Sequence, residues 1–395
     1  MSKIVAISDP HLGQNGVDGL GQYSLLSTKV PQNLVAQFAQ ATAAFAAGDP
    51  ITLLVAGDFL DLSLAYAEDA LADLYALLSA FTGAGIARVS EIVYVVGNHD
   101  QHLWSLHSED KRLLDPLRKG LVPINGDRPG AKALYQITGV EGEPFTILQP
   151  LVSKIFGSAV PNITIAYPSF VRQLDAQTRL YVTHGHLFGG LYTEMSSLVA
   201  NKLAGVPYDQ AVATVNQPLI EFIYWLLGET GQGIGADGLV EEIYTDIQKG
   251  SISLVRGLVA QIVTQILPHG VLWRVIGGLE RRIVVDAVMA ELNKVLLSPK
   301  AADNASADRF ADLETTRAGL AAWLTAVGWP TQQSTIVLYG HTHVWDDYPI
   351  PNTAFHSWNL CTWLVEPDHA QPKTGFLAID GAVARWIDVP QAATP

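Results

Sequence analysis

The sequence predicts an α/β protein whose sheet has parallel neighbouring strands, and three observations support this fold class. Apolar runs of strand length alternate with helical patterns through the first hundred residues, which is typical of strand–helix–strand units. A polar cluster follows each of these strands, at the sheet edge where ligands gather in such folds. Strand-like runs return at residue 334, after a long stretch of helical patterns. The sheet-forming part of the chain is therefore predicted to be discontinuous.

Three strands and two helices make up the predicted first region. Pro31 stands near the start of the first helix and Gly48 at its end, where proline and glycine favour helix boundaries. The strands are predicted at 3–8, 51–56 and 91–96, and the helices at 31–48 and 66–85. Further strands are predicted at 145–148, 162–167, 178–183, 334–340, 355–365, 374–380 and 383–389.

The long helical patterns between residues 190 and 330 predict a second unit inserted into the first. We expect a discontinuous α/β core at 1–190 and 331–395, and a helical insertion at 191–330. Because both ends of the insertion lie near polar clusters of the core, we expect it to form a cap that shapes the substrate pocket. Two alternatives stay open: an amphipathic surface that contacts lipid or a lipid-like substrate, and a homodimer interface.

The composition is that of a globular, acidic protein. Hydrophobic residues make up 49% and charged residues 16% of the chain, so it can bury a large core. The formal net charge is −14, from 24 basic and 38 acidic residues. This balance argues against nucleic acid as the main partner, because binding to a phosphate backbone needs a basic surface.

Several features of the sequence bear on the compartment. Cys361 is the only cysteine, which excludes an internal disulfide and fits a reducing environment. The N-terminus enters a strand almost at once, so we expect no signal peptide. No run of 18 or more uncharged apolar residues predicts a transmembrane span. We therefore expect a cytoplasmic location.

Five polar clusters hold the candidate functional residues. Each cluster by itself has a structural explanation, since an aspartate can cap a helix and a Gly-Asn pair forms turns readily. Together they hold six of the 11 histidines, and all of them would meet at one edge of the sheet. One binuclear metal site explains them with a single cause. The clusters are Asp9-Pro10-His11, Gly57-Asp58, Gly97-Asn98-His99-Asp100, His184-Gly185-His186 and His341-Thr342-His343.

These clusters carry a resemblance to a known family. The series Asp9-x-His11, Gly57-Asp58-x-x-Asp61, Gly97-Asn98-His99-Asp100, His184-Gly185 and Gly340-His341-x-His343 resembles the calcineurin-like metallophosphoesterase superfamily. All five motifs occur in order, whereas the region from 190 to 330 resembles no family we can name. The resemblance implies a four-layer α/β/β/α sandwich, with two metal ions at the edge between its sheets. It also implies a hydrolase of phosphate mono- or diesters, with a small-molecule phosphate ester as substrate.

The resemblance also implies a ligand set. One metal would be held by Asp9, His11, Asp58 and His343. The other would be held by Asp58, Asn98, His184 and His341, so that Asp58 bridges the two ions. Carboxylate, imidazole and amide ligands suit Mn, Fe, Zn or Ni, and the sequence does not choose among these divalent metals.

By the same resemblance, a hydroxide that bridges the metals would attack phosphorus, and His99 would protonate the leaving group as general acid. Asp61 would orient the His99 ring, and Asp100 would hold the loop. Asn98 is assigned to substrate binding as well as to the metal. His186 either contacts substrate phosphate or stabilises its turn, and the sequence leaves both readings open.

Two other functions compete with a phosphoesterase. One is a scaffold that keeps this fold but is catalytically silent, and the other is a nuclease that uses the same chemistry. The presence of His99 beside a complete ligand set favours the enzyme, and the acidic net charge argues against the nuclease. The motifs also differ from those of phosphoprotein phosphatases and purple acid phosphatases, and they fit best the broad bacterial-type phosphodiesterase and phosphatase groups.

Overall fold

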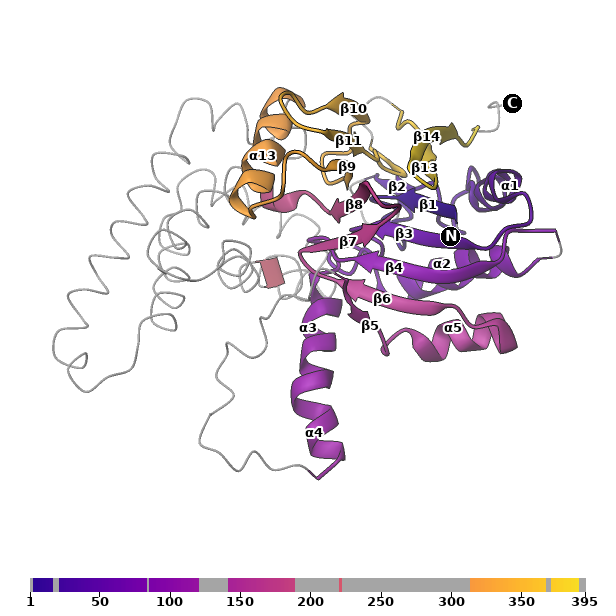
Figure 1. Cartoon of the computed structure of the whole chain (residues 1–395). Helices are drawn as coiled ribbons and strands as arrows, with labels where there is room; N and C mark the ends of the chain where they lie inside the picture. The colour runs from indigo at the N-terminus through magenta and orange to yellow at the C-terminus, as the bar shows by residue number, and fades with distance from the viewer. Residues whose placement is uncertain are drawn as a thin grey trace, which may run out of the picture.

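The computed structural model describes residues 3–16, 21–83, 85–120, 141–188, 220–221, 313–366 and 371–390. These residues form two mixed β-sheets, a small strand pair and a set of helices (Figure 1). The predicted α/β class is confirmed.

The larger sheet has seven strands in the order β14-β13-β1-β3-β4-β6-β5. Its centre is parallel, because β1, β3, β4 and β6 run in one direction, while the remaining strands pair antiparallel. The bounds are β1 (Lys3–Ile7), β3 (Ile51–Ala56), β4 (Val89–Val95), β5 (Glu143–Pro144), β6 (Asn162–Ala166), β13 (Gly375–Asp380) and β14 (Val383–Asp388).

The smaller sheet has five strands in the order β10-β11-β9-β8-β7. Its three central strands are parallel, and β7 and β10 close its edges in the opposite direction. The bounds are β7 (Ser169–Gln173), β8 (Thr178–Thr183), β9 (Ser334–Tyr339), β10 (Asp346–Pro349) and β11 (Phe355–Asn359), and a separate pair joins β2 (Tyr23–Ser24) to β12 (Leu364–Val365).

The helices connect and cover these sheets. Three consecutive pieces, α3, the π-helical turn η2 and α4, follow one another without a break and project away from the sheets (Figure 1). The bounds are α1 (Val35–Ala46), α2 (Ala67–Ser79), η1 (Ala80–Thr82), α3 (Gln101–Glu109), η2 (Asp110–Leu114), α4 (Asp115–Arg118), α5 (Gln149–Phe156), η4 (Gly157–Ala159), η5 (His186–Phe188) and α13 (Leu313–Ala326).

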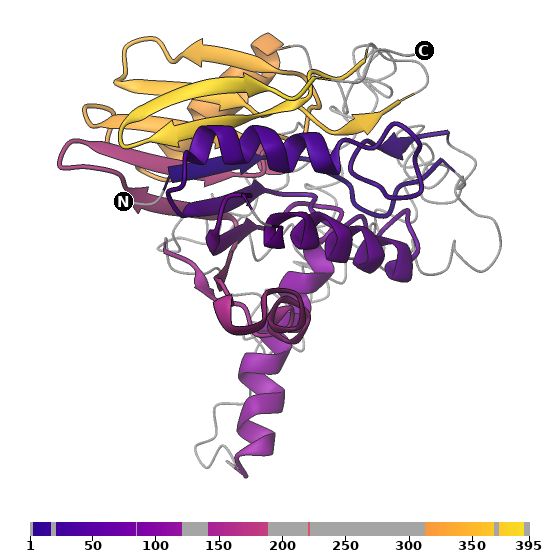
Figure 2. The same ribbon diagram turned by 90° about the vertical axis from the view of Figure 1, so that its right-hand side faces the viewer.

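Alternation along the central strands builds two separate cores. Successive side chains of a strand point to opposite faces, so apolar residues at every position supply both faces of the larger sheet. Ile4, Leu54 and Val93 pack between the two sheets. Val5 and Leu53, one position away, pack on the outer face with residues of α1, α2 and α5. Figure 2 shows α1 and α2 side by side on that outer face.

The helix α13 covers the outer face of the smaller sheet. The indole Nε1 of Trp323 donates a hydrogen bond to the Tyr181 hydroxyl on β8 at 2.7 Å. The Arg317 guanidinium donates to both carboxylate oxygens of Asp346 on β10, at 2.8 and 2.5 Å. The described residues therefore stack in four layers, in the order helix, sheet, sheet, helix.

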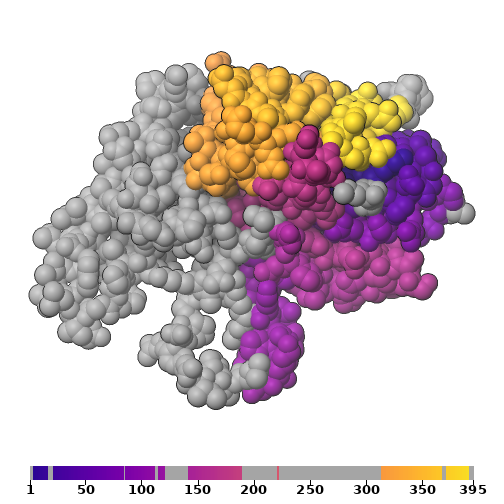
Figure 3. All heavy atoms as spheres, viewed as in Figure 1, coloured from indigo at the N-terminus to yellow at the C-terminus, as the bar shows by residue number. Residues whose placement is uncertain are grey.

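The two ends of the chain meet in the larger sheet. Strand β13 pairs with β1, although more than 360 positions separate them, and β14 extends the sheet beyond it. The space-filling view shows the yellow C-terminal residues in contact with the indigo N-terminal segment (Figure 3). None of the helices within the described ranges is long and apolar enough to cross a membrane.

Two predicted strands differ from the structure. The run 145–148 is not a strand, because β5 ends at Pro144 and α5 begins at Gln149 with Pro150 in its first turn, a position that favours proline. The run 355–365 is broken between β11 and β12. Of the predicted insertion at 191–330, the structure describes only 220–221 and 313–330, so the insertion and its boundaries stay predictions.

Burial between the sheets gives a test of the fold. Leu338 is fully buried there, and its truncation in Leu338→Ala leaves a cavity that costs about 2–5 kcal/mol. We expect the free energy of unfolding, measured by urea denaturation, to fall by that amount. The matched variant Leu117→Ala, at a side chain that is 62% exposed, should change it by about 0.5 kcal/mol or less. Equal effects of the two variants would contradict the layered packing.

Candidate metal centre

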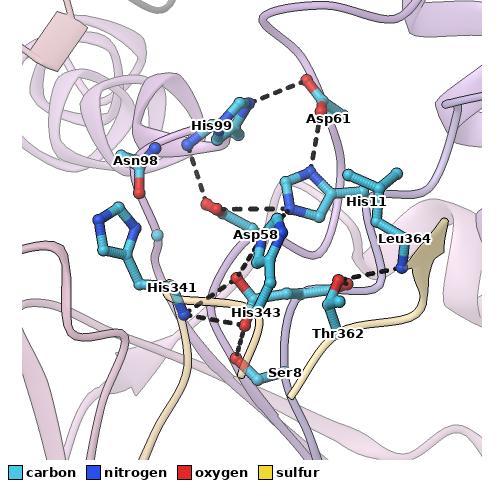
Figure 4. A network of polar contacts seen from close by, with 12 residues as sticks. Ser8, His11, Asp58, Asp61, Asn98, His99, His341, His343, Thr362 and Leu364 are labelled. Atoms are coloured by element: carbon cyan, nitrogen blue, oxygen red, sulfur yellow. Dashed lines mark hydrogen bonds and ion pairs between the residues drawn. The ribbon is translucent and has the colours of Figure 1, made fainter. Parts of the chain in front are cut away.

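The candidate site lies where five parallel strands end. Each of β1, β3, β4, β8 and β9 runs directly into one of the polar motifs of the sequence. Because parallel strands present their carboxyl ends at the same edge, the two sheets bring the motifs together between them. Figure 4 shows side chains from the loops after β1, β3, β4 and β9 converging on one another.

The backbone at the site adopts an uncommon conformation. Five candidate ligands have positive φ: Asp9 (50°), His11 (43°), Asp58 (48°), His341 (72°) and His343 (59°). For L-residues the left-handed region costs about 1–2 kcal/mol each, and such strain is typical of functional sites. The surrounding fold therefore holds these residues in a conformation that lowers stability, as is typical of residues that serve a functional site.

Glycines in the motifs make room for the ligands. A Cβ atom on Gly97 would lie 2.1 Å from Oδ1 of Asp58. On Gly340 it would lie 1.8 Å from Oγ of Ser8 and 2.1 Å from Oδ2 of Asp9. All three distances are far below van der Waals contact, so no side chain larger than that of glycine fits before Asn98 or His341.

The first group of possible ligands contains Asp9, His11 and His343. The Nε2 atoms of the two histidines are 3.2 Å apart, and Nε2 of His343 lies 3.5 Å from Oδ1 of Asp9. The opposite ring nitrogens have their own partners: Nδ1 of His11 lies 2.9 Å from Oδ2 of Asp61, and Nδ1 of His343 lies 3.5 Å from Oε2 of Glu366. Both Nε2 atoms are thereby turned toward each other.

The second group contains Asp58, His184 and His341. Nδ1 of His184 donates to the Ala56 carbonyl oxygen at 2.9 Å. Its Nε2 atom lies 3.1 Å from Oδ2 of Asp58 and 3.1 Å from Oδ1 of Asn98. The backbone N–H of His341 donates to both carboxylate oxygens of Asp9, at 3.1 and 3.0 Å. This hydrogen bond connects the second group to the first.

Asp58 lies between the groups. Its Oδ2 atom, which faces His184, is 3.8 Å from Nε2 of His11 in the first group. Asp58 also forms a third possible group with His11 and His99, and its Oδ1 atom accepts a hydrogen bond from the His99 backbone N–H at 2.9 Å. The bridging role of Asp58 stays a prediction, and the geometry also places His99 beside these candidate ligands.

The buried charges at the site attract positive charge. Burial opposes ionisation of Asp58, yet the neighbouring His184, His99 and His11 hold the pKa of its carboxyl well below its usual range. Burial also opposes protonation of His184, whereas the carboxylates of Asp58 and Asp9 raise its pKa. A field that draws a proton onto a buried imidazole also draws a metal ion.

The donor set fits two divalent ions. With Nδ1 of His184 donating to a carbonyl, Nε2 faces two acceptors, a carboxylate and an amide oxygen. In the first group two Nε2 atoms and a carboxylate oxygen converge in the same way. Facing acceptors repel unless a proton or a metal cation lies between them, and a cation can be shared by all of them at once. Nitrogen and oxygen ligands of this kind suit Mn, Fe, Zn and Ni.

Asp61 and His99 form a network next to the ligands. Oδ1 of Asp61 lies 3.2 Å from Nδ1 of His99, and Oδ2 contacts His11 as described above. Burial works against the charge of Asp61, but His99 and His11 hold the pKa of its carboxyl well below its usual range. One carboxylate therefore contacts both a predicted ligand and the predicted general acid.

His186 and Asp100 lie at the border of the site. The His186 ring is buried, stacked on Tyr167 with centroids 6.3 Å apart, and 5.4 Å from the His184 ring. Asp100 accepts hydrogen bonds from the backbone N–H groups of Phe59 and Gly97, both at 2.7 Å, and contacts the Tyr94 hydroxyl. These contacts agree with the expectation that Asp100 holds the loop, while the role of His186 stays a prediction.

An open pocket gives access to the site. Its lining includes His11, Asp58, Asn98, His99 and His343, so ligands and predicted acid face the same space. Seven of the ten predicted site residues line this pocket, whereas Asp9, His184 and His186 do not.

Several site residues were missed by the sequence analysis. Glu366 reaches His343, and Thr362 donates from Oγ1 to the Asp9 carbonyl oxygen at 2.9 Å. Ser63 contacts His99 at 2.6 Å, and Ser8 contacts the Asp9 carboxylate. Ser8 and Ser63 stand next to motifs and could have been considered. Glu366 and Thr362 belong to no motif, and only the folded chain places them.

Comparison with known proteins identifies the family. A family model described as calcineurin-like phosphoesterase matches residues 2–216, more than half of the chain. The chain belongs to this family, as its motifs and its buried Asp and His groups indicate.

Individual relatives add little. No curated protein matches this sequence. Among solved structures, the chain is similar to a phosphopantetheinyl hydrolase from Mycobacterium tuberculosis, with 13% sequence identity over 94% of this chain and 98% of the other. The TM-score is 0.27, and at this value the likeness supports no inference.

The central position of Asp58 leads to a test of metal binding. In Asp58→Asn the carboxylate between the two groups becomes a neutral amide, so both ions should bind more weakly. We expect the metal content, measured by elemental analysis after equilibration with Mn²⁺ and gel filtration, to fall from about two ions per chain to less than one. The variant Asp347→Asn, at an exposed residue of β10 that does not line the pocket, is the control and should retain both ions. Retention of both ions by Asp58→Asn would rule out the bridging role.

Proposed function

We propose that this protein hydrolyses phosphate esters with two divalent metal ions and with His99 as the general acid. The observation that carries the proposal is the shared pocket. His99 lines it together with candidate ligands, and Nδ1 of His99 contacts Ser63 and Asp61. Membership of the calcineurin-like phosphoesterase family supports the reaction class.

The two ions would be held by the residues that the sequence assigns to them. Asp9, His11, Asp58 and His343 would hold one ion, and Asp58, Asn98, His184 and His341 the other. When bound, two such ions supply Lewis acidity, which makes water a better nucleophile and stabilises charge on the phosphoryl oxygens. The residues of the chain contribute the orientation of the ligands, the exclusion of bulk water and a proton for the leaving group.

His99 is suited to proton donation. Its side chain is 13% exposed, so the ring is mostly enclosed but can reach a bound ester. Nδ1 faces Asp61 and Ser63, so we assign proton donation to the other ring nitrogen, Nε2. A leaving alkoxide that receives a proton from Nε2 needs no other acid, and general acid catalysis of this kind contributes about 10²–10⁴-fold.

The same pocket accommodates Asn98 in its two predicted roles. Asn98 is buried, and its Oδ1 atom faces the second group of ligands, while the residue also lines the pocket. Its amide N–H₂ group can donate to a phosphoryl oxygen, since an amide offers an acceptor and a donor side. We therefore assign Asn98 to both the metal and the substrate, and we leave His186 as a candidate substrate contact.

A leaving-group comparison tests the role of His99. In His99→Ala the hydrolysis of phenyl phosphate esters should fall about 10²–10⁴-fold, because phenolate is a poor leaving group without a proton. Hydrolysis of p-nitrophenyl esters should fall far less, since that leaving group departs as an anion. Rates and metal content are measured with Mn²⁺ supplied, and metal content should stay near that of the wild type.

Controls separate this role from its alternatives. His356→Ala, at an exposed histidine of β11, should behave as the wild type. Loss of metal in His99→Ala would instead make His99 a ligand, in keeping with its place in the third group. A wild-type protein that binds metal but cleaves no ester in a panel of mono- and diesters, nucleotides and phospholipid head groups would support the catalytically silent scaffold.

A further inference from the structure

Ser63 lies between the predicted general acid and its carboxylate partner. Its Oγ atom is 2.6 Å from Nδ1 of His99 and 2.9 Å from Oδ1 of Asp61. The direct separation of Nδ1 and Oδ1 is longer, at 3.2 Å. Each of the two contacts through the Ser63 hydroxyl is therefore shorter than the direct contact between the His99 ring and the carboxylate.

The hydrogen bonds in these contacts can be assigned in one direction of donation, from His99 through Ser63 to Asp61. Oδ1 of Asp61 already accepts hydrogen bonds from the backbone N–H groups of Ser63 (3.2 Å) and Leu64 (2.9 Å), so this oxygen acts as an acceptor. The hydroxyl has a single proton, and it can donate that proton to Oδ1 while its lone pair accepts from Nδ1–H of His99. The ring then carries its Nδ1 proton toward Ser63 and presents Nε2 to the pocket.

Asp61 contacts a candidate metal ligand through one carboxylate oxygen and the predicted general acid through the other, and Ser63 contacts only the second of these oxygens. The carboxylate of Asp61 contacts His11 through Oδ2 at 2.9 Å, and Gln14 donates to the same oxygen at 3.2 Å. A change at Asp61 would therefore disturb a candidate metal ligand together with the acid. Ser63 contacts His99 and Oδ1, on the side of the carboxylate that faces away from His11.

We propose that Ser63 is a positioning residue for His99, and that its hydroxyl relays the hydrogen bond from Nδ1–H of the ring to the Asp61 carboxylate. The hydroxyl sets the orientation of the protonated ring by accepting from its Nδ1–H, so that the Nε2–H of the imidazolium meets the leaving-group oxygen and donates its proton there. Ser63 itself touches no substrate. This inference rests on the proposed role of His99 as general acid and adds a residue outside the family motifs.

Ser63→Ala tests the relay. Ser63 is 2% exposed, so water has little room to replace the lost hydroxyl, and His99 keeps only its longer contact with Asp61. We expect kcat for phenyl phosphate esters to fall roughly 10- to 100-fold, the range that follows from losing one hydrogen bond to an ionised partner. KM, metal content and kcat for p-nitrophenyl esters should each stay within about threefold of the wild type, because the loss is confined to proton donation.

Two further variants complete the test. Ser63→Thr retains a hydroxyl and should restore kcat for phenyl esters to within about tenfold of the wild type. Ser90→Ala is the matched control, because Ser90 Oγ also donates a partly buried hydrogen bond, to the Ile51 carbonyl oxygen at 3.0 Å, at the opposite end of β4 from the site. It should leave both kcat values unchanged.

The outcomes distinguish this inference from the proposed function. Equal losses on the two esters in Ser63→Ala, or loss of metal, would overturn the relay and make Ser63 a structural residue. A normal Ser63→Ala protein beside a defective His99→Ala protein would also overturn the relay, while the general acid would stand. If His99→Ala shows no dependence on the leaving group, the role of His99 fails first and the relay fails with it.

Discussion

The structure depends on a cluster of buried acceptor atoms that face one another. Carboxylate oxygens of Asp9 and Asp58 and imidazole Nε2 atoms approach one another within 3.1–3.9 Å, almost without solvent. Burying carboxylates without compensation is costly, and the local fold increases the cost by holding five of these residues at positive φ. Divalent cations at the centre of the cluster would offset both costs, so these atoms form a candidate metal centre.

The fold places the carboxylate and imidazole groups of this cluster in the loops that follow its strands. Two sheets with parallel centres end at a common edge, so that segments far apart in the chain meet after β1, β3, β4, β8 and β9. The backbone at Gly97 and Gly340 lies so close to the carboxylates of Asp58 and Asp9 that only glycine is accommodated at these two positions. Behind the acceptors, partners on Nδ1 orient the rings: Asp61 for His11, a backbone carbonyl for His184 and Glu366 for His343. Such outer partners determine ring orientation and ligand basicity.

Much of this could be predicted from the sequence, for physical reasons that differ between elements. The central strands are continuous apolar runs because both of their faces are buried, and the motifs follow them directly. The break after Asn359 could not be predicted, because it arises from tertiary contacts: the Asn359 side chain donates to Thr342 Oγ1 at 2.6 Å, and Thr362 turns to Asp9. Glu366 was missed for the same reason. Ser63 stands in a turn between Leu62 and Leu64, and only its 2.6 Å contact with His99 reveals its position.

Anomalous X-ray diffraction from crystals grown with Mn²⁺ tests the central claim most directly, since it locates each ion without reference to activity. The account predicts two anomalous peaks, one among Asp9, His11, Asp58 and His343, and one among Asp58, Asn98, His184 and His341, with Asp58 in contact with both. Absence of peaks at these residues, or a single ion bound by His11, Asp58 and His99, would contradict it.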